Sequence, residues 1–383
     1  MIINADLHVH SKFSLATSKN MTPDIMAPES EKKGLDLIAT GDALHKTWQN
    51  ILEEELEETE EGIYKLKDKY PKTKTQFIIT TEVEDNQRIH HLLLIPNLET
   101  AKELREILNT PKTDTNGRPR LDMNGEEIIN LAHEYDCTVG PAHIFTPWTG
   151  IYKTYDSIKD CYNKKPDFVE LGLSADSNMA DTIKELQDYT FLTNSDSHSP
   201  WPHRIGREFN KIDVKKITYS NLQKSIKENK IIGNYGFDPR MGKYHETGCI
   251  KCKKIYTIQE AKKRDMKCSC SGIIKKGVNG RIQELASWPL PQHPKKRPKY
   301  TYLLPLAELI SSTYNKGVTT KFVQTRWENL INEYHTEINV LLKVHIDELK
   351  KKDETLAKII ESYRKNKLKV TPGRGGEYGK VDY

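Results

Sequence analysis

The chain has 383 residues, which at about 150 residues per domain suggests two or three domains. Hydrophobic residues make up 36% of the chain and charged residues 30%, and the mean hydropathy is −0.70. The apolar residues nevertheless gather in separate runs, such as Phe77–Thr81 and Leu92–Ile95, so we expect a folded core rather than wholesale disorder. No stretch approaches the roughly 18–20 apolar residues of a membrane span, and the first residues do not resemble a signal peptide. We therefore expect no membrane partner and a cytoplasmic, nucleoid-associated location.

The net charge of +5 hides an asymmetry along the chain. Residues 240–383 contain 30 Lys and Arg against 15 Asp and Glu, a net charge of +15, whereas residues 1–239 carry a net charge of −10. An acidic front and a basic rear suggest an enzyme-like domain followed by a part that binds polyanions. The alternative is that the basic residues only solvate exposed helices.

The first 235 or so residues alternate short apolar runs with helical patterns. The candidate strands are Ile2–Leu7, Asp36–Thr40, Gln76–Glu82, Leu92–Ile95, Thr138–Pro141, Phe168–Gly172 and Thr190–Asn194. Helical periodicity marks Glu126–Tyr135 and Ala180–Gln187, and Gln49–Tyr70 has the pattern of a Glu-rich helix. Alternation of strands and helices predicts an α/β fold with a parallel sheet or barrel.

The composition changes after Gly236. Four of the six cysteines and many lysines lie between residues 240 and 290, and a proline-rich basic connector, Trp288–Pro298, follows. Beyond it we expect helices at Leu303–Ser312, Lys321–Val344 and Glu354–Lys365, and then a Gly-rich tail. We therefore divide the chain into residues 1–238, 239–290 and 291–383.

Residue types that bind metals recur where the predicted strands end. His8 and His10 follow the first strand and project to the same side, because successive strand residues alternate faces. The other such residues are Asp42, Glu82, His90, His91, His143, Glu170, Asp196 and His198. Imidazole and carboxylate ligands suit Zn²⁺, Mn²⁺ or Fe²⁺, and in a barrel the carboxyl ends of the strands converge on one face. One such residue alone is more often a hydrogen-bonded core residue, but their joint placement predicts a site for several metal ions.

These residues resemble the motifs of the polymerase-and-histidinol-phosphatase (PHP) family of metal phosphoesterases. The matching segments are ADLHVHS with Asp6, His8 and His10; Glu82 with His91 in HHLLLIP; PAHIF with His143; and NSDSHS with Asp196 and His198. The resemblance implies a distorted seven-stranded β/α barrel that holds two or three divalent ions, of Zn²⁺, Mn²⁺ or Mg²⁺. The metal ligands we expect are His8, His10, Asp42, Glu82, His91, His143, Asp196 and His198.

The second motif of the family is usually Thr-Asp-His, but this chain has Gly41-Asp42-Ala43 at that place. We expect Asp42 to keep its role and do not assign the nearest histidine, His45. His90 is left out because its side chain should point away from that of His91. We assign catalysis to His143, Asp196 and His198, with Asp196 both binding metal and aligning the attacking water.

Two cysteine pairs lie in the basic middle segment. Cys249 and Cys252 are spaced as in a zinc knuckle, and Cys268 and Cys270 follow fifteen residues later with a tighter spacing. Disulfides are not expected in a chain without export signals. We predict a zinc ribbon with one structural Zn²⁺ on these four thiols, and nonspecific phosphate contacts from the surrounding lysines.

The order of the parts makes the resemblance more specific. The barrel motifs, the cysteine ribbon ending KKGVNGRIQELA, the segment RPKYTYLLPLAELI and the tail PGRGGEYGKV together resemble the endonuclease Q group of PHP nucleases. This resemblance implies incision of double- or single-stranded DNA on the 5′ side of hypoxanthine, uracil, xanthine or an abasic site. The products would carry a 3′-hydroxyl and a 5′-phosphate. We expect DNA or base contacts from Trp148, Trp201, Arg204, Gly373, Arg374, Gly375, Gly376 and Tyr378.

Two other functions are compatible with parts of the sequence. A PHP small-molecule phosphatase would share the front motifs but has no evident use for a zinc ribbon and a basic rear. A non-catalytic DNA-binding scaffold would account for the departure in the second motif. Salt-sensitive DNA affinity distinguishes the nuclease from the phosphatase, and the metal content of the barrel distinguishes it from the scaffold.

Overall fold

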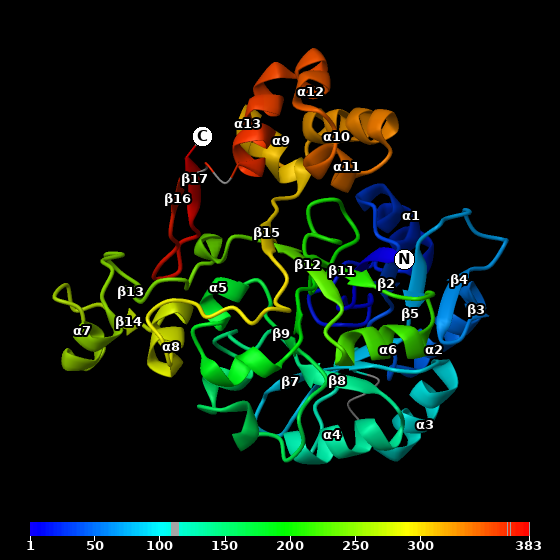
Figure 1. Ribbon diagram of the computed structural model, residues 1–383, viewed down its shortest axis with the longest axis horizontal. Coiled ribbons are helices and arrows are strands. Elements are labelled where there is room, and N and C mark those ends of the chain that lie inside the picture. The colour runs from blue at the N-terminus through cyan, green and yellow to red at the C-terminus, as the bar shows by residue number, and fades with distance from the viewer. Residues whose placement is uncertain (109–114, 366, 368, 383) are drawn as a thin grey trace.

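The computed structural model describes residues 1–108, 115–365, 367 and 369–382. Figure 1 shows a large α/β body, a small lobe formed by residues 239–290 at its left side, and a group of helices formed by residues 306–364 above it. Within the described residues no helix is both long enough and apolar enough to span a membrane.

Among the described residues, strands occupy all seven positions that the sequence predicts. They are β1 (Ile2–Asp6), β2 (Leu37–Ala39), β5 (Gln76–Ile78) continued by β6 (Thr80–Glu84), β7 (His90–Leu94), β8 (Thr138–Pro141), β9 (Val169–Glu170) and β10 (Phe191–Leu192). β1, β2 and β5 are parallel, β6 to β8 form an antiparallel meander, and β9 is parallel to β10. The ring closes where Leu7 N donates to Asn194 Oδ1 and His10 N donates to Ser197 O. The distorted seven-stranded β/α barrel is therefore confirmed.

Apolar side chains fill the barrel and cover its outside. Leu37 packs with Ile3 and Phe168 in one cluster, whereas its neighbour Ile38 packs with Trp48 in the other. Strands buried on both faces need this continuous apolar character. The surrounding helices are α1 (Pro23–Lys33), α2 (Lys46–Glu55), α3 (Leu98–Leu108), α4 (Gly125–Glu134), α5 (Ser177–Ala180) and α6 (Tyr219–Lys227) (Figure 1).

The single helix predicted for Gln49–Tyr70 is wrong. Helix α2 ends at Glu55, and the chain continues as an antiparallel hairpin of β3 (Leu56–Glu60) and β4 (Ile63–Leu66), which joins β5. Glutamates four residues apart in this segment would repel each other on a helix. Gly62 makes the turn with φ +66°, and a Cβ there would lie 2.1 Å from the carbonyl oxygen of Pro96.

Three further strands extend the barrel sheet beyond β1. They are β11 (Phe209–Asp213), β12 (Ile231–Gly236) and β15 (Tyr300–Tyr302), and β15 is parallel to β12. The basic connector leads to β15 along the barrel, where Arg297 pairs with buried Asp181 at 3.0 Å and its guanidinium lies 3.3 Å from the ring centre of Phe191. The chain therefore returns to the barrel sheet after the cysteine-rich segment. The division at residues 238 and 290 remains our proposal.

The small lobe has little core of its own. Its elements are β13 (Gly248–Cys249), α7 (Ile258–Lys263), β14 (Ile274–Lys275) and α8 (Val278–Leu285). Cysteines 249 and 268 pack with Tyr256, Ala261 and Ile274 in its apolar cluster. The hairpin of β16 (Lys369–Thr371) and β17 (Lys380–Asp382) lies between this lobe and the upper helices (Figure 1).

The upper helices are α9 (Leu306–Tyr314), α10 (Lys321–Tyr334), α11 (Glu337–Leu342), α12 (Ile346–Lys352) and α13 (Glu354–Arg364). The continuous helix predicted for Lys321–Val344 is interrupted at His335, whose φ is +71°, so that α10 and α11 are separate. Thr336 then begins α11 by accepting a hydrogen bond from Asn339 N.

Candidate metal centre

Glu82 on β6 lies at the centre of a cluster of imidazole and carboxylate side chains. Its Oε1 lies within 3.6 Å of a ring nitrogen of each of three histidines, His8, His90 and His143. Its Oε2 lies 3.5 Å from His10 Nε2 and 3.0 Å from Arg118 Nη1. One buried carboxylate therefore connects four imidazoles and a guanidinium.

Both histidines at the end of β1 are fixed through Nδ1. His8 Nδ1 lies 3.0 Å from Glu170 Oε2, and His10 Nδ1 lies 3.1 Å from Asp42 Oδ1. Their Nε2 atoms consequently face the cluster, where His10 Nε2 is 3.1 Å from Asp196 Oδ1. A carboxylate behind the imidazole is the usual arrangement of a metal-binding histidine, because it fixes the ring and raises its basicity.

Of the two histidines on β7, the structure brings His90 into the cluster and not His91, the one expected from the sequence. In the β6–β7 register Glu84 stands opposite His90, so His90 shares a face with Glu82 and joins the cluster. His91 points to the other face, where its Nδ1 is 2.6 Å from the Tyr162 hydroxyl and its Nε2 is 3.2 Å from Asp85 Oδ2. The alternation of the two side chains was predicted correctly, but the face was not.

Asp196 and His198 follow β10 and line the open side of the cluster. Asp196 Oδ1 lies 3.1 Å from His10 Nε2 and 3.6 Å from His198 Nε2, and the ring of His198 stacks on that of His10 at 4.4 Å. Their side chains are 31% and 35% exposed, whereas those of His10 and Glu82 are 1% exposed. A substrate would therefore approach from this side.

Three residues of the site have backbone conformations that side chains rarely adopt. Asp42, His143 and Asp196 have φ values of +49°, +30° and +46°. Gly172 makes the conformation of His143 possible, since a Cβ at Gly172 would lie 2.5 Å from His143 Cβ. Such strain persists only where the surrounding structure enforces it, and it concentrates at functional sites.

The charges of the cluster favour a cation at its centre. Burial alone would raise the pKa of Asp196 and Glu82, but the adjacent imidazoles hold both values well below the usual range. Burial lowers the pKa of His8, yet Glu170 and Glu82 outweigh it and raise the pKa to about 9. The imidazoles supply the positive charge that these buried carboxylates need, and a divalent ion bound among them would take the place of the imidazole protons.

The donor set suits divalent ions. Three groups have ligand atoms within 4.8 Å of one another: His8, His10 and Glu82; Glu82, His90 and His143; and His10, Asp196 and His198. Glu82 and His10 each belong to two groups, so they can connect neighbouring ions. His8 Nε2 is buried and has no hydrogen-bond partner among the described residues, as expected of an atom reserved for a metal.

Asp42 lies behind the cluster and belongs to none of the three groups formed by the described residues. Its Oδ1 faces His10 Nδ1, and its Oδ2 accepts hydrogen bonds from the backbone N–H and the hydroxyl of Ser11, both at 2.6 Å. Asp42, expected as a ligand, thus lies behind His10 and contacts its Nδ1. His45, left unassigned from the sequence, begins α2 and stacks on Phe13 at 4.2 Å.

Sequence reasoning missed Arg118. It lies on the segment between the undescribed residues 109–114 and α4, and its side chain is 25% exposed. No strand precedes Arg118 within the described part of this segment, so a search for functional residues at the ends of strands could not find it. Its position beside Glu82 arises only from the tertiary fold.

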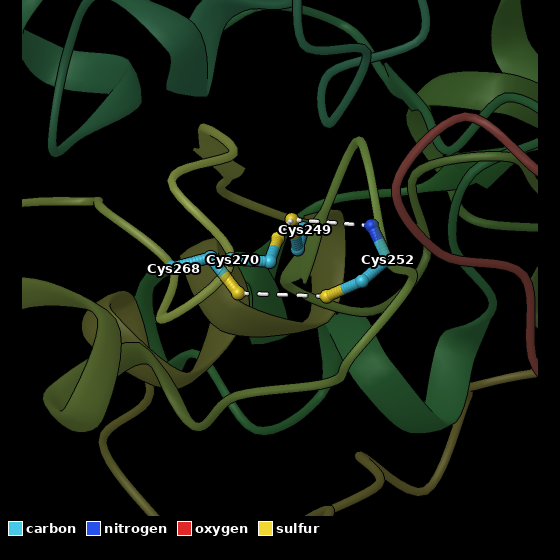
Figure 2. A group of neighbouring side chains, drawn as sticks. All are labelled: Cys249, Cys252, Cys268 and Cys270. Carbon is cyan, nitrogen blue, oxygen red and sulfur yellow. Dashed lines mark hydrogen bonds between the residues drawn. The ribbon is translucent and has the colours of Figure 1, made fainter.

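The four cysteines of the small lobe converge, as Figure 2 shows. Cys252 Sγ lies 3.5 Å from Cys268 Sγ, and Cys249 Sγ lies 3.5 Å from Cys270 Sγ. The backbone N–H of Cys270 lowers the pKa of Cys268 to about 5 together with the Tyr256 hydroxyl, which favours the thiolate that metals bind. Four sulfur ligands at this spacing suit a tetrahedral zinc site.

Both tryptophans expected to contact DNA lie at the surface. Trp148 is 58% exposed and lines a cavity of about 370 Å³ together with Phe145, Tyr152 and Lys275. This loop begins at the metal cluster, because Thr146 N donates to the carbonyl oxygen of His143. Trp201 is 41% exposed, and Arg204, on the same loop, is also exposed.

The Gly-rich tail packs on the small lobe. A Cβ at Gly373 would lie 2.2 Å from the carbonyl oxygen of Gly242, and one at Gly375 would lie 2.3 Å from that of Cys249. Arg374 Nε donates to the carbonyl oxygen of Lys253. Gly373, Arg374 and Gly375, expected as DNA contacts, thus pack against the lobe, whereas a Cβ at Gly376 would come no closer than 3.7 Å to a described atom, the Tyr244 hydroxyl, and Tyr378 is 67% exposed.

Comparison with known sequences finds one family model and two relatives that match parts or all of this chain. The family model "MJ0043 C-terminal domain" matches residues 305–367. The uncharacterized protein MJ0043 of Methanocaldococcus jannaschii is 54% identical over 67% of this chain, which spans only 34% of that relative. The uncharacterized protein YqxK of Bacillus subtilis is 31% identical, with 99% of both chains covered.

Solved structures decide the family. The lesion-specific endonuclease PfuEndoQ of Pyrococcus furiosus is 45% identical, with a TM-score of 0.94 over 100% of this chain and 95% of that chain. This chain belongs to the endonuclease Q family. A second endonuclease Q structure, in complex with a 27-mer duplex that has an abasic lesion at the active site, gives a TM-score of 0.92 and 45% identity over 100% of this chain and 96% of that chain. The family resemblance seen in the sequence is thereby confirmed.

Proposed function

We propose that this chain is a metal-dependent DNA repair endonuclease. It hydrolyses the phosphodiester on the 5′ side of hypoxanthine, uracil, xanthine or an abasic site, and leaves a 3′-hydroxyl and a 5′-phosphate. The observation that carries the proposal is 45% identity over the whole chain to a lesion-specific endonuclease. The endonuclease Q complex with abasic duplex DNA supports damaged DNA as the partner.

The cluster around Glu82 would hold two or three ions of Zn²⁺, Mn²⁺ or Mg²⁺; its imidazoles suit Zn²⁺ and its carboxylates suit Mn²⁺ or Mg²⁺. Bound ions would activate a water molecule and neutralise charge on the phosphate. Asp196, partly exposed on the open side, would accept a hydrogen bond from the attacking water. His198 Nδ1 is held 2.6 Å from the Thr17 hydroxyl, so its Nε2 faces the cluster, where it would help to hold an ion that neutralises charge on the leaving 3′-oxygen.

Two more residues support this reaction. His143 Nε2 lies 3.0 Å from Glu82 Oε1 and keeps that carboxylate in place between its neighbours. Arg118, 3.0 Å from Glu82 Oε2 on the other side, presents a guanidinium that can donate to a phosphate oxygen.

Cleavage next to a particular base requires that the base leave the duplex stack. The cavity beside Trp148 has an aromatic wall and lies directly after His143, so we propose it as the place for the everted nucleotide. Trp201 and Arg204, at the exposed surface that follows Asp196 and His198, are proposed to contact the DNA strands.

The small lobe is proposed as a zinc ribbon that binds the DNA backbone. Residues 239–290 contain 12 Lys and Arg against 4 Asp and Glu, and one Zn²⁺ would be held by Cys249, Cys252, Cys268 and Cys270. Because the lobe has a small apolar core, zinc would supply much of its folding free energy. The proposed substrate implies a cytoplasmic, nucleoid-associated protein.

The proposal is tested by incision of end-labelled duplexes that carry one deoxyinosine, deoxyuridine or abasic site, with Mg²⁺ or Mn²⁺ present. The wild type should cut once, on the 5′ side of the lesion, and EDTA should abolish the cut. Asp196→Asn should slow incision by more than the roughly 10–100-fold typical of an outer-shell partner, with DNA affinity retained.

Asp188→Asn is the matched control, since Asp188 is exposed and lies outside the cluster, and it should cut like the wild type. Absence of any lesion-dependent cut by the wild type would refute the proposal. Release of phosphate from monoesters would then identify a PHP phosphatase, and DNA binding without barrel metals would identify a scaffold.

A further inference from the structure

The segment from Ser11 to Ser18 forms the rim of the metal centre. Ser14 Oγ lies 3.1 Å from His10 Nδ1, and Thr17 Oγ1 lies 2.6 Å from His198 Nδ1. Ser18 N donates to the carbonyl oxygen of His198 at 2.8 Å. The rim is therefore tied at both ends to histidines of the cluster.

A second segment holds this rim from the other side. Asn116 Oδ1 accepts a hydrogen bond from Leu15 N, and Gly117 N donates to the carbonyl oxygen of Phe13. A Cβ at Gly117 would lie 2.3 Å from Asp42 Oδ2 and 2.7 Å from Ser14 Oγ, so the two segments are in close contact. The next residue is Arg118, which reaches Glu82.

Leu15 stands at the tip of the rim, and its side chain has no place in the apolar core. It is 76% exposed, more than any other large apolar side chain of the described residues. Ser14 beside it is buried, and Ala16 has φ +61°, a conformation that costs free energy for a residue with a Cβ. A strained, tightly held turn that presents a leucine to water beside a metal centre calls for a ligand that covers the leucine.

We propose that Leu15 is a wedge that enters the base stack of duplex DNA when the damaged nucleotide is everted toward the metal centre. Apolar side chains that insert between bases offset the free energy lost by unstacking. Lys12 lies in the rim and Lys19 follows directly after it, so both are near the tip in sequence and suit contacts to backbone phosphates. The inference rests on the proposed function and assigns to this rim the opening of the duplex.

The test compares Leu15→Ala with the wild type on one lesion-bearing strand, either annealed or single-stranded. Single-stranded DNA needs no wedge. We therefore expect the variant to lose about tenfold in kcat/KM on the duplex and less than about twofold on the single strand. A 2-aminopurine placed opposite the lesion should brighten on binding of the wild type and less on binding of the variant.

Two further variants complete the experiment. Leu290→Ala removes a leucine that is 69% exposed on the basic connector, and it should leave kcat/KM unchanged on both substrates. Leu15→Met keeps a long apolar side chain at the tip and should retain duplex cleavage. Equal rates of Leu15→Ala and wild type on the duplex would overturn the wedge, and so would an equal loss on both substrates. If the wild type cuts neither substrate, the proposed function fails instead.

Discussion

At the scale of single residues, His90 and His91 are adjacent on β7 and have different surroundings. His90 Nδ1 lies 2.8 Å from Glu82 Oε1 and 3.2 Å from His143 Nε2, within a candidate metal group. His91 is bound to the Tyr162 hydroxyl on the other face of the strand. The two positions therefore separate a contribution to metal binding from a contribution to folding.

We predict that His90→Ala lowers the number of ions bound per barrel and abolishes incision, because it removes an imidazole from the group with Glu82 and His143. His91→Ala should keep the metal content and lower the free energy of unfolding by about 1–3 kcal/mol, the cost of leaving a buried hydroxyl unpaired. Elemental analysis of purified protein and urea denaturation measure the two effects. Metal loss in His91→Ala with none in His90→Ala would reverse the assignment.

These two histidines also show what the sequence could and could not predict about the site. Residues at the ends of predicted strands, such as His8, His143 and Asp196, were found because strand ends converge in a barrel. The face of His90 depends on the register of β6 against β7, and a shift of one residue turns every side chain to the other face. Arg118 was not found because its contact with Glu82 depends on a loop that only the complete fold positions.

At the scale of elements, one buried ion pair joins the upper helices to the barrel. Lys33 at the end of α1 lies 2.6 Å from Glu337 at the start of α11, and the two side chains are 3% and 1% exposed. Lys33 also donates to the carbonyl oxygen of Pro202, on the loop that follows the metal centre. Glu337 accepts from Leu306 N and from Trp327 Nε1, so it holds α9, α10 and α11 together.

We predict that Glu337→Gln destabilises the protein by about 3–5 kcal/mol, because it leaves the Lys33 ammonium buried without a counter-charge. Adding Lys33→Met should restore most of this loss, since no buried charge then remains. Urea denaturation of the single and double variants measures both changes. The control is Glu54→Gln, which breaks the exposed pair with Lys69 and should leave the midpoint unchanged. If the losses of unfolding free energy in the two single variants simply added up in the double variant, the two charges would not depend on each other.

The elements themselves were predicted with uneven success. The barrel strands followed from short apolar runs that are buried on both faces. The hairpin of β3 and β4 was missed because its leucine and isoleucine spacing also fits a helix, and only pairing with β5 decides between the two. The strand β15 was assigned to a helix-rich region, because its parallel pairing with β12, in which Tyr300 stands opposite the distant Asn234, leaves no local pattern in the sequence.

At the scale of the whole molecule, the basic residues 240–383 begin with the small lobe and end with the Gly-rich tail, and these two segments are in contact. The tail returns from the upper helices to the small lobe, where Lys253 Nζ donates to the carbonyl oxygen of Gly375 and Gly376 N donates to that of Lys243. Lys243 in turn lies over the exposed ring of Tyr378, 4.6 Å from its centre. Lobe and tail therefore present their basic and aromatic side chains as one surface, whose shape depends on the cysteine site beneath it.

We predict that Cys268→Ala removes one zinc ion per chain, loosens the packing of the tail on the lobe, and weakens DNA binding while the barrel keeps its metals. The logarithm of DNA affinity should then fall less steeply with the logarithm of salt concentration, by about 0.9 for each phosphate that the protein no longer neutralises. Fluorescence anisotropy across a salt series and elemental analysis measure these effects. Cys137→Ala is the control, because Cys137 is buried in the barrel and should alter neither the zinc content nor the slope. An unchanged slope in a zinc-free variant would mean that the barrel and the upper helices bind the phosphates instead, and the DNA-binding surface would then have to be sought around Trp201 and Arg204.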